Sequence, residues 1–236
     1  DANSRTTNGL TEKGKVQATK SAKQLAGKGI TKIYCSPLLR AKETAEIAAE
    51  IIGISKDEII YDERLRELNT GDFDKTSDID EFIIFRAEHS IDKPIPGGES
   101  YLDAKRRFGS FLYEIEHSEK NEKILIISHG IAFKSLDAVV RGLDKKKSWE
   151  SVLDISNKEG KGEFREISFT PLPHNRDYEL DFHLPYIDQI QLEDEKGETL
   201  TRIPEVVDCW VESGSMPFAE YHYPFENQQE FKKRSP

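Results

Sequence analysis

The stretch that most limits the fold of this chain is KILIIS, residues 123–128, which runs directly into His129 and Gly130. Four of its residues are aliphatic in succession, so it lacks the alternation of a strand with one face in water. Such a run is typical of a short strand covered on both faces, as in a parallel sheet between layers of helices. Hydrophobic residues make up 36% of the chain, which is enough to bury a core of that kind.

Helical and strand patterns alternate along the first two thirds of the chain. Thr11 and Ser100 are residue types that cap helices, and each precedes a segment with apolar residues on one helical face. We expect four helices: one that begins after Thr11, one over residues 41–52, one that begins after Ser100 and one over residues 131–141. We expect strands over residues 30–36, 58–65, 123–128 and 162–169. This order predicts an α/β fold, a layered and mainly parallel sheet with helices on both faces.

The character of the sequence changes after Phe169. The stretch TPLPHNRDYELDFHLPYID contains three prolines and has no sustained period. We therefore place a domain boundary near Thr170, with an α/β domain over residues 1–170 and a less regular segment over residues 171–236.

Three residues with reactive side chains follow predicted strands: Arg40, Glu67 and His129. The carboxyl ends of parallel strands share one edge of a sheet, where α/β proteins bind their ligands, so we expect the three to converge. A guanidinium at a helix start can bind an anion, and a carboxyl group can protonate a leaving group. Each also has a plainer interpretation. Arg40 could be a solvated surface arginine, Glu67 a solvated loop glutamate and His129 a hydrogen-bonded structural histidine.

In this order, LTEKG, SPLLRAKETA, DERLRELNTG, PGGES and ILIISHG resemble the motifs of the histidine phosphatase superfamily, which has the phosphoglycerate-mutase-like fold. The resemblance covers residues 1–169. In that family a histidine in an Arg-His-Gly motif takes up the phosphoryl group of a phosphorylated molecule. The resemblance implies that Arg40 is the second phosphate-binding arginine and His129 the second histidine. It also implies that Glu67 is the acid and that Asn3 lines the phosphate pocket.

The chain departs from the family at its amino terminus, because Asp1-Ala2-Asn3 aligns just after the Arg-His-Gly motif and no such triplet is present. The nucleophilic histidine and the first arginine are therefore missing. We expect either a piece of a longer protein or a degenerate relative, and the absence of an initiator methionine favours the first. In either case these residues alone are expected to be inactive as a phosphatase.

A second resemblance lies near the other end, in YELDFHLPYIDQIQL and RIPEVVDCWVESGSMPFAEYHYPFEN. These stretches are similar to class I isoleucyl-tRNA synthetase, where the chain re-enters the catalytic domain after the editing insertion. The resemblance implies that Trp210 lines the pocket for the isoleucine side chain. It also implies a parent ligase that uses ATP with magnesium, isoleucine and tRNA. Neither ATP-binding signature is present, so we expect no cofactor on this chain alone, and no zinc because the synthetase-like segment lacks a cysteine pair.

Composition and charge limit the binding partners and the cellular location that we expect. A net charge of −10 disfavours nucleic-acid binding by the whole chain, and no apolar run is long enough for a membrane span. Two distant cysteines fit a reducing cytoplasm. Our leading hypothesis is an internal segment of an isoleucine–tRNA ligase that carries an inserted phosphatase-like domain. The alternatives are a free-standing phosphomonoesterase acting through phosphohistidine, and a non-catalytic phosphate-binding pseudo-phosphatase.

Overall fold

The computed structural model describes residues 8–75, 79–119, 122–154, 162–201 and 210–234. The chain consists of two compact units, Asp1–Ile190 and Gln191–Pro236, and each is described by itself. The domain boundary near Thr170 remains a prediction from the sequence.

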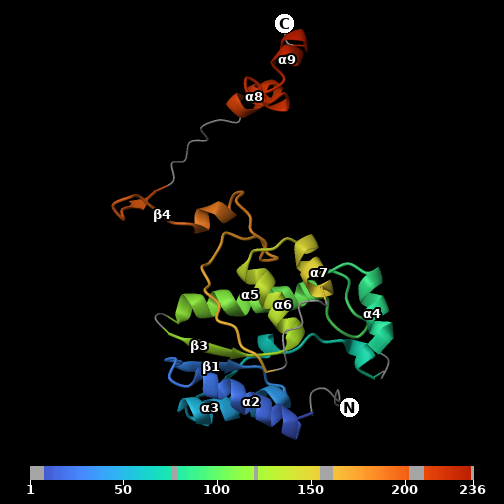
Figure 1. The fold of residues 1–236 in the computed structure, drawn as a ribbon, viewed down its shortest axis with the longest axis vertical. Coiled ribbons are helices and arrows are strands. Elements are labelled where there is room, and N and C mark those ends of the chain that lie inside the picture. The colour runs from blue at the N-terminus through green and yellow to red at the C-terminus, as the bar shows by residue number, and fades with distance from the viewer. Residues whose placement is uncertain (1–7, 76–78, 120–121, 155–161, 202–209, 235–236) are drawn as a thin grey trace. The chain divides into compact units, whose positions relative to one another are not determined.

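Among the described residues, three strands form a parallel sheet at the centre of the first unit (Figure 1). It contains β1 (Lys32–Cys35), β2 (Ile60–Tyr61) and β3 (Ile124–Ile127), in the spatial order β2-β1-β3. In the register, Tyr34 lies beside Ile60 on one side and beside Ile126 on the other. All three strands therefore end at the same edge of the sheet, as the sequence predicts.

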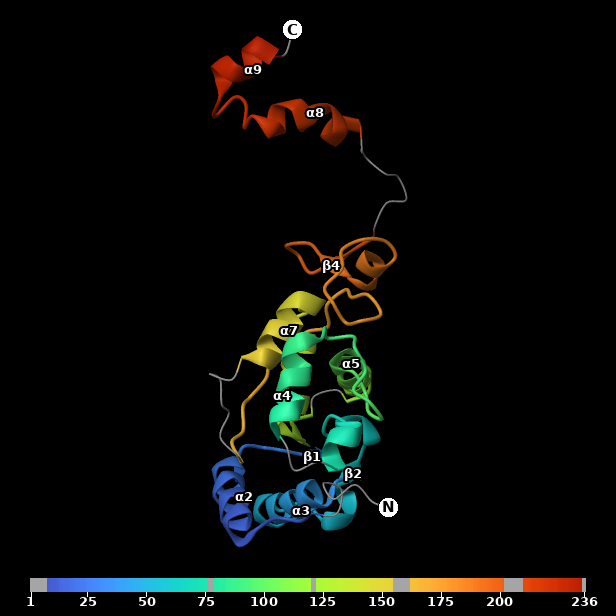
Figure 2. The same ribbon diagram turned by 90° about the vertical axis from the view of Figure 1, so that its right-hand side faces the viewer.

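Helices cover both faces of this sheet, with α2 (Glu12–Leu25) and α3 (Leu39–Ile52) on one face and α5 (Tyr101–Ser118) and α6 (Gly130–Val140) on the other (Figures 1 and 2). The alternation of β1 decides which side chains meet which layer. Ile33 and Cys35 are fully buried among the alanines of α2 and α3. Tyr34 lies on the opposite face in a cluster with Phe108 and Phe111 of α5. The predicted layered α/β fold is confirmed.

Local sequence signals set the helix ends that the patterns predict. The Thr11 hydroxyl accepts a hydrogen bond from the Gly14 backbone N–H at 3.1 Å, which satisfies one free donor at the start of α2. Ser100 and Asp103 form a reciprocal capping box at the start of α5. Helix α3 ends at Gly53, whose φ of 90° is readily adopted by glycine.

Helices α4 (Ile79–Glu88) and α7 (Lys145–Leu153) were not expected from the sequence. The short helical turn η1 (Lys56–Glu58) lies between α3 and β2, and η2 (Glu63–Leu65) and η3 (Gly71–Lys75) lie between β2 and α4. The strand predicted over residues 162–169 is wrong, since these residues form no ladder. Ile167 and Phe169 pack against the α5 and α6 cluster, so the apolar alternation has a packing role without a pairing partner.

The segment that follows, from Leu172 to Leu180, packs on helix α5. The Tyr113 hydroxyl donates to the Leu172 carbonyl oxygen at 3.0 Å and accepts from its N–H at 3.1 Å. Buried Asp177 pairs with Arg106 of α5 at 2.6 Å. The Tyr178 ring lies directly against Gly109, where an added Cβ would be 2.3 Å from the ring. Residues 172–180 are therefore part of the first unit.

The described part of the second unit contains a short hairpin and two helices. Its elements are β4 (Leu192–Glu193), β5 (Thr199–Leu200), α8 (Trp210–Glu220) and α9 (Gln228–Arg234), and a 3-10 turn, η4 (Tyr186–Gln189), precedes them. Phe231 of α9 is buried against Phe218 and Tyr223, with ring centroids 5.0 and 4.5 Å away. Across the described parts of both units, no helix is long and apolar enough to cross a membrane.

Candidate phosphate-binding site

His129 lies at the point where β3 turns into α6. It is the N-cap residue of α6, with extended backbone angles, and its side chain is only 7% exposed. The imidazole Nε2 lies 2.8 Å from the hydroxyl of Ser36, which is itself buried at the end of β1. Neighbouring parallel strands thus bring together two residues that are 93 positions apart.

The charge around His129 is strongly positive. Burial of the imidazole has the largest effect on its pKa, and the charges of Arg40, Arg107 and Arg66 add to it. Together they lower the pKa of His129 to about 3. The ring is therefore neutral near pH 7 and can share one proton with Ser36. An anion that neutralises these guanidinium groups would remove part of this penalty.

Arg40 enters the site from the first turn of α3, which begins at Leu39. Just before this helix, the Ser36 hydroxyl accepts a hydrogen bond from the Leu38 N–H at 3.3 Å. The turn between β1 and α3 therefore fixes Ser36 toward His129 and starts the helix that carries Arg40. A guanidinium beside the positive end of a helix is suited to an anionic ligand.

Glu67 lies beyond β2 and η2, and its carboxyl group faces the start of α6. It accepts a hydrogen bond from the Leu68 N–H at 2.9 Å. Burial raises the pKa of the Glu67 carboxyl group above its usual value, and this outweighs the opposing effects of Leu68, of Arg40 and of the N–H groups of Ile131 and Ala132. A carboxyl group whose pKa is raised by burial is better suited to act as a general acid than an ordinary one.

Arg107 of α5 holds the loop that carries Glu67. Its guanidinium donates to the carbonyl oxygens of Arg64, Arg66 and Glu67, at 2.5, 2.7 and 3.3 Å. The Glu99 carboxylate accepts two more hydrogen bonds from it, at 2.8 and 3.0 Å. Arg107 therefore joins α5, the PGGES loop and the Glu67 loop, besides adding positive charge near His129.

The structure brings three of the five site residues predicted from the sequence to one place: Arg40, Glu67 and His129. Asn3 lies outside the described residues. Trp210 is the first residue of α8, and its side chain is outside what the structure describes. The roles assigned to all five residues remain predictions.

Sequence reasoning missed two residues, Ser36 and Arg107. Ser36 directly follows β1, as Ser128 and then His129 follow β3, and a polar residue at a strand end is a signal that could have identified it. Arg107 lies within an ordinary amphipathic helix, and nothing in its local sequence distinguishes it from neighbouring arginines.

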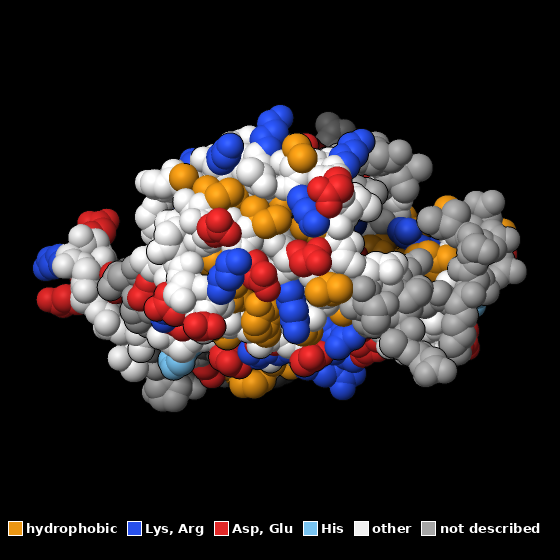
Figure 3. Space-filling model, turned by 90° about the horizontal axis from the view of Figure 1, so that it is seen from below, with side chains coloured by type: hydrophobic (Ala, Val, Ile, Leu, Met, Phe, Trp, Pro, Cys, Tyr) orange, Lys and Arg blue, Asp and Glu red, His pale blue; other side chains and the backbone are white. Residues whose placement is uncertain are grey.

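The described residues do not gather three histidine, cysteine, aspartate or glutamate side chains as a metal ion would require. The donors of the site are cationic or N–H groups, which suit an anion rather than a cation. On the face of the molecule that α2 and α3 cover, basic and acidic side chains are intermixed (Figure 3). The described side chains on that face form no continuous basic stripe of the sort that binds nucleic acid.

Comparison with protein families agrees with this geometry. The profile of the histidine phosphatase superfamily (branch 1) matches residues 2–158. The chain belongs to this superfamily. Residues 159–236 match the class I tRNA synthetases for isoleucine, leucine, methionine and valine. A histidine phosphatase domain is thus followed by a class I synthetase segment, as the two resemblances in the sequence predict.

Similar curated proteins include isoleucine–tRNA ligases. The ligase of Bacillus thuringiensis (strain Al Hakam) is 56% identical over 59 residues, which is 25% of this chain and 6% of the ligase. The ligase of Clostridium kluyveri is 41% identical over 101 residues, which is 40% of this chain and 10% of the ligase. The chain therefore spans a small part of the length of these relatives.

The solved structures that match the chain include phosphatases. Bacillus stearothermophilus YhfR is 30% identical with a TM-score of 0.52, over 62% of this chain and 76% of that one. The mycobacterial glucosyl-3-phosphoglycerate phosphatase is 24% identical with a TM-score of 0.53, over 62% of this chain and 74% of that one. The second likeness concerns the fold alone.

Proposed function

We propose that the α/β unit of this chain binds a phosphate monoester, with Arg40 and His129 on the phosphate and Glu67 as proton donor to the leaving oxygen. The observation that supports this best is the convergence of His129, Ser36 and Glu67 at one sheet edge, within the field of Arg40. The negative charge of a phosphoryl group is spread over its oxygens, so fixed cations and N–H donors stabilise its binding and its transfer.

Turnover requires a nucleophile in addition to these groups. In the chemistry of the superfamily, an imidazole nitrogen forms a bond to phosphorus while the bond to the ester oxygen breaks. The proton of Glu67 goes to that oxygen, and water then releases phosphate from the phosphohistidine. The chain has no Arg-His-Gly triplet, so we expect these 236 residues to bind the ester without hydrolysing it.

Titration calorimetry with inorganic phosphate and with vanadate tests the binding step. Arg40→Ala and His129→Ala are each expected to weaken phosphate by about tenfold or more, the scale of a lost charge-assisted hydrogen bond. Arg141→Ala is the matched control, because this arginine is exposed and paired only with Asp137 among the described residues. Undiminished phosphate binding by both site variants would refute the assignment.

A second experiment separates a phosphomonoesterase from a phosphate-binding pseudo-phosphatase. A segment that contains Arg-His-Gly is added before Asp1, and hydrolysis of aryl phosphates is followed. Turnover that depends on His129 and Glu67 supports the esterase, whereas binding without turnover supports the pseudo-phosphatase. Hydrolysis by the original 236 residues would show that another group is the nucleophile.

The match to isoleucine–tRNA ligases favours a second function for the rest of the chain. We propose that residues 171–236 re-enter the catalytic domain of such a ligase, with the phosphatase-like domain as an inserted unit. The identity of 56% over 59 residues supports this. The complete ligase would use ATP with magnesium, isoleucine and tRNA in the cytoplasm. The ATP-binding signatures would lie elsewhere in it, since this chain contains neither.

The full reading frame and one substitution test the ligase proposal. Trp210→Ala in the complete ligase is expected to raise the KM for isoleucine by about 10-fold or more, because a lost apolar wall costs on the order of 1–3 kcal/mol of discrimination. Trp149→Phe, in the phosphatase unit, is the control and should leave that KM unchanged. A reading frame without ATP-binding signatures on either side would exclude the ligase.

A further inference from the structure

The hydroxyl group of Ser36 is held in place by backbone hydrogen bonds. Ser36 directly follows β1 and is 0% exposed, and its backbone N–H donates to the Ile127 carbonyl oxygen of β3 at 2.9 Å. Its hydroxyl oxygen accepts a hydrogen bond from the Leu38 N–H at 3.3 Å, which closes a local serine turn. The imidazole Nε2 of His129 lies 2.8 Å from the same oxygen. The fold therefore fixes this oxygen at one nitrogen of the ring.

The hydrogen of this hydroxyl group has one acceptor within the described residues, the His129 Nε2. A serine hydroxyl has one hydrogen and two lone pairs, and the Leu38 N–H already uses a lone pair. Because a fully buried hydroxyl group that donates to nothing is costly, the hydrogen must point to Nε2. The imidazole is neutral near pH 7, since its pKa is about 3, and a neutral ring carries a hydrogen on one nitrogen only. With Nε2 as the acceptor, that hydrogen is on Nδ1.

The other ring nitrogen of His129, Nδ1, has no hydrogen-bond partner within the described residues. It is also not one of the buried side-chain atoms that lack a partner there, which are Arg86 Nε and the Tyr101 hydroxyl oxygen. Nδ1 is therefore accessible to solvent, although the side chain is only 7% exposed. His129 is the N-cap residue of α6, so an Nδ1–H group would be an unused donor beside the positive end of a helix.

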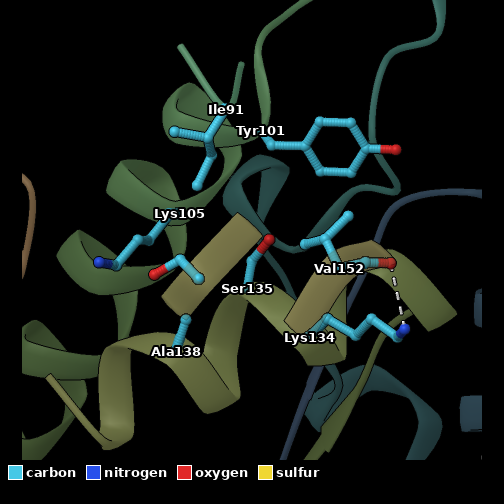
Figure 4. A pocket seen from close by; sticks show the side chains of 8 residues that line it. Ile91, Tyr101, Lys105, Lys134, Ser135, Ala138 and Val152 are labelled. Atoms are coloured by element: carbon cyan, nitrogen blue, oxygen red, sulfur yellow. Dashed lines mark hydrogen bonds between the residues drawn. The ribbon is translucent and has the colours of Figure 1, made fainter. Parts of the chain in front are cut away.

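The small cavity between α5, α6 and α7 offers no alternative place for an anion. Its volume is about 10 Å³, room for one water at most, and Lys105 and Lys134 line it (Figure 4). Lys105 donates to the Leu143 carbonyl oxygen, and Lys134 donates to the Val152 carbonyl oxygen at 3.3 Å. Both cations are thus used within the fold, and a phosphate group is too large for this space.

The burial of Ser36 also decides between two possible roles for it. A serine beside a histidine is the arrangement of an activated nucleophile. The oxygen of such a nucleophile must reach the phosphorus atom, and no part of Ser36 is exposed. Ser36 therefore acts through His129 and is a positioning residue.

We propose that Ser36 holds His129 in the tautomer that carries its proton on Nδ1, so that Nδ1–H donates to a phosphoryl oxygen. This role rests on the phosphate binding proposed above, whereas the tautomer can be measured without a ligand. An ionised phosphoryl oxygen accepts hydrogen bonds, so it is attracted by an N–H group and repelled by a bare nitrogen. Ser36 thus prepares the imidazole as a donor before the phosphate arrives.

Nuclear magnetic resonance of the imidazole nitrogens in the 236-residue chain tests the tautomer. Histidine labelled with the heavy nitrogen isotope is incorporated, and the signals that His129→Gln removes are those of His129. In the wild type at neutral pH we expect a protonated Nδ1 and a bare Nε2. In Ser36→Ala we expect a mixture of both tautomers, because Nε2 has lost its donor. Ser135→Ala is the matched control, since Ser135 is also buried and lies on α6, and it should give the wild-type spectrum.

Calorimetry with inorganic phosphate tests the consequence for binding. Ser36→Ala is expected to weaken phosphate binding by about three- to tenfold, because the imidazole remains but must first adopt the donating tautomer. The loss should be smaller than in His129→Ala, which removes the donor altogether. Ser135→Ala should bind phosphate as the wild type does.

A proton on Nε2 in the wild type would overturn the inference, and that measurement does not depend on the folding of any variant. A pure Nδ1–H tautomer in Ser36→Ala, or an unchanged phosphate affinity in that variant, would overturn it as well. The two proposals fail in different ways. If the wild type carries the proton on Nδ1 and Ser36→Ala mixes the tautomers while inorganic phosphate fails to bind, the phosphate site is refuted and the effect of Ser36 on the tautomer stands.

Discussion

The buried imidazole of His129 should make the stability of the first unit depend on pH. In the unfolded chain a histidine takes up its proton near pH 6.5, whereas in the folded site the pKa of His129 is about 3. The folded-state pKa is the lower one, so the unfolded state binds more protons between these values. The stabilising effect of the neutral ring is complete above about pH 6.5 and is lost as the pH falls toward 3.

The slope follows from the linkage relation. Each pH unit in this window removes about 1.4 kcal/mol from the free energy of unfolding. Between pH 6.5 and pH 5.0 the loss is about 2 kcal/mol, and acidic side chains contribute little there because most carboxyl groups titrate lower. The relevant quantity is the difference between the wild type and His129→Gln, since glutamine keeps a polar side chain but cannot titrate.

Urea unfolding followed by circular dichroism at pH 7.0 and at pH 5.0 measures this difference. We expect the wild type to lose about 2 kcal/mol more than His129→Gln between the two conditions, at similar m-values. His183→Gln is the control, because that side chain is 93% exposed. Saturating phosphate should reduce the slope, since an anion between the guanidinium groups favours protonation of His129. Equal losses in the wild type and in His129→Gln would refute the burial argument.

Three further outcomes follow from the packing and the charges. Glu67→Gln should stabilise the protein at pH 7, because folding raises the pKa of Glu67 and so disfavours the ionised carboxylate that the unfolded chain carries at this pH. Glutamine has no ionised form, so it removes this penalty. The gain in stability should vanish near pH 4 in the same urea assay. Gly109→Ala should lower stability by about 1–3 kcal/mol because its Cβ would overlap the Tyr178 ring, whereas Gly214→Ala, with no atom within 4 Å, should not, as thermal unfolding can show. A chain ending at residue 170 should melt at lower temperature than one ending at residue 190, since it lacks the partners of Tyr113 and Arg106; equal melting temperatures would contradict this.

The sequence could predict those parts of the fold that depend on local pattern. The aliphatic run before His129 required a covered strand, and the strand-end positions of Arg40 and Glu67 follow from that topology. Helix α4 could not be predicted in this way, because Phe82, Ile83, Ile84 and Phe85 are consecutive and do not mark one helical face. Only the folded chain shows that Phe82 and Phe85 pack inward while Ile83 and Ile84 are exposed.

The missed parts of the site depend on contacts between distant positions. Arg107 binds carbonyl oxygens of residues 64–67, some forty positions away, and backbone oxygens carry no signature in a sequence. The predicted strand over residues 162–169 failed for the opposite reason. Apolar and polar residues do alternate in this segment. A strand also needs a free sheet edge to pair with, and the sequence pattern does not show whether one is available.

The contact between Gly109 and Tyr178 has a consequence for how such a chain could arise. The two sequence families meet at residues 158 and 159, yet Tyr178 from the synthetase side rests on a helix from the phosphatase side. The boundary between the two sequence families therefore lies within one compact unit. Exchange of the upstream partner for another phosphatase would cost about 1–3 kcal/mol of stability if the incoming helix placed a methyl group beneath that ring. Recombination at this junction is thus favoured when the incoming helix has a glycine at that position.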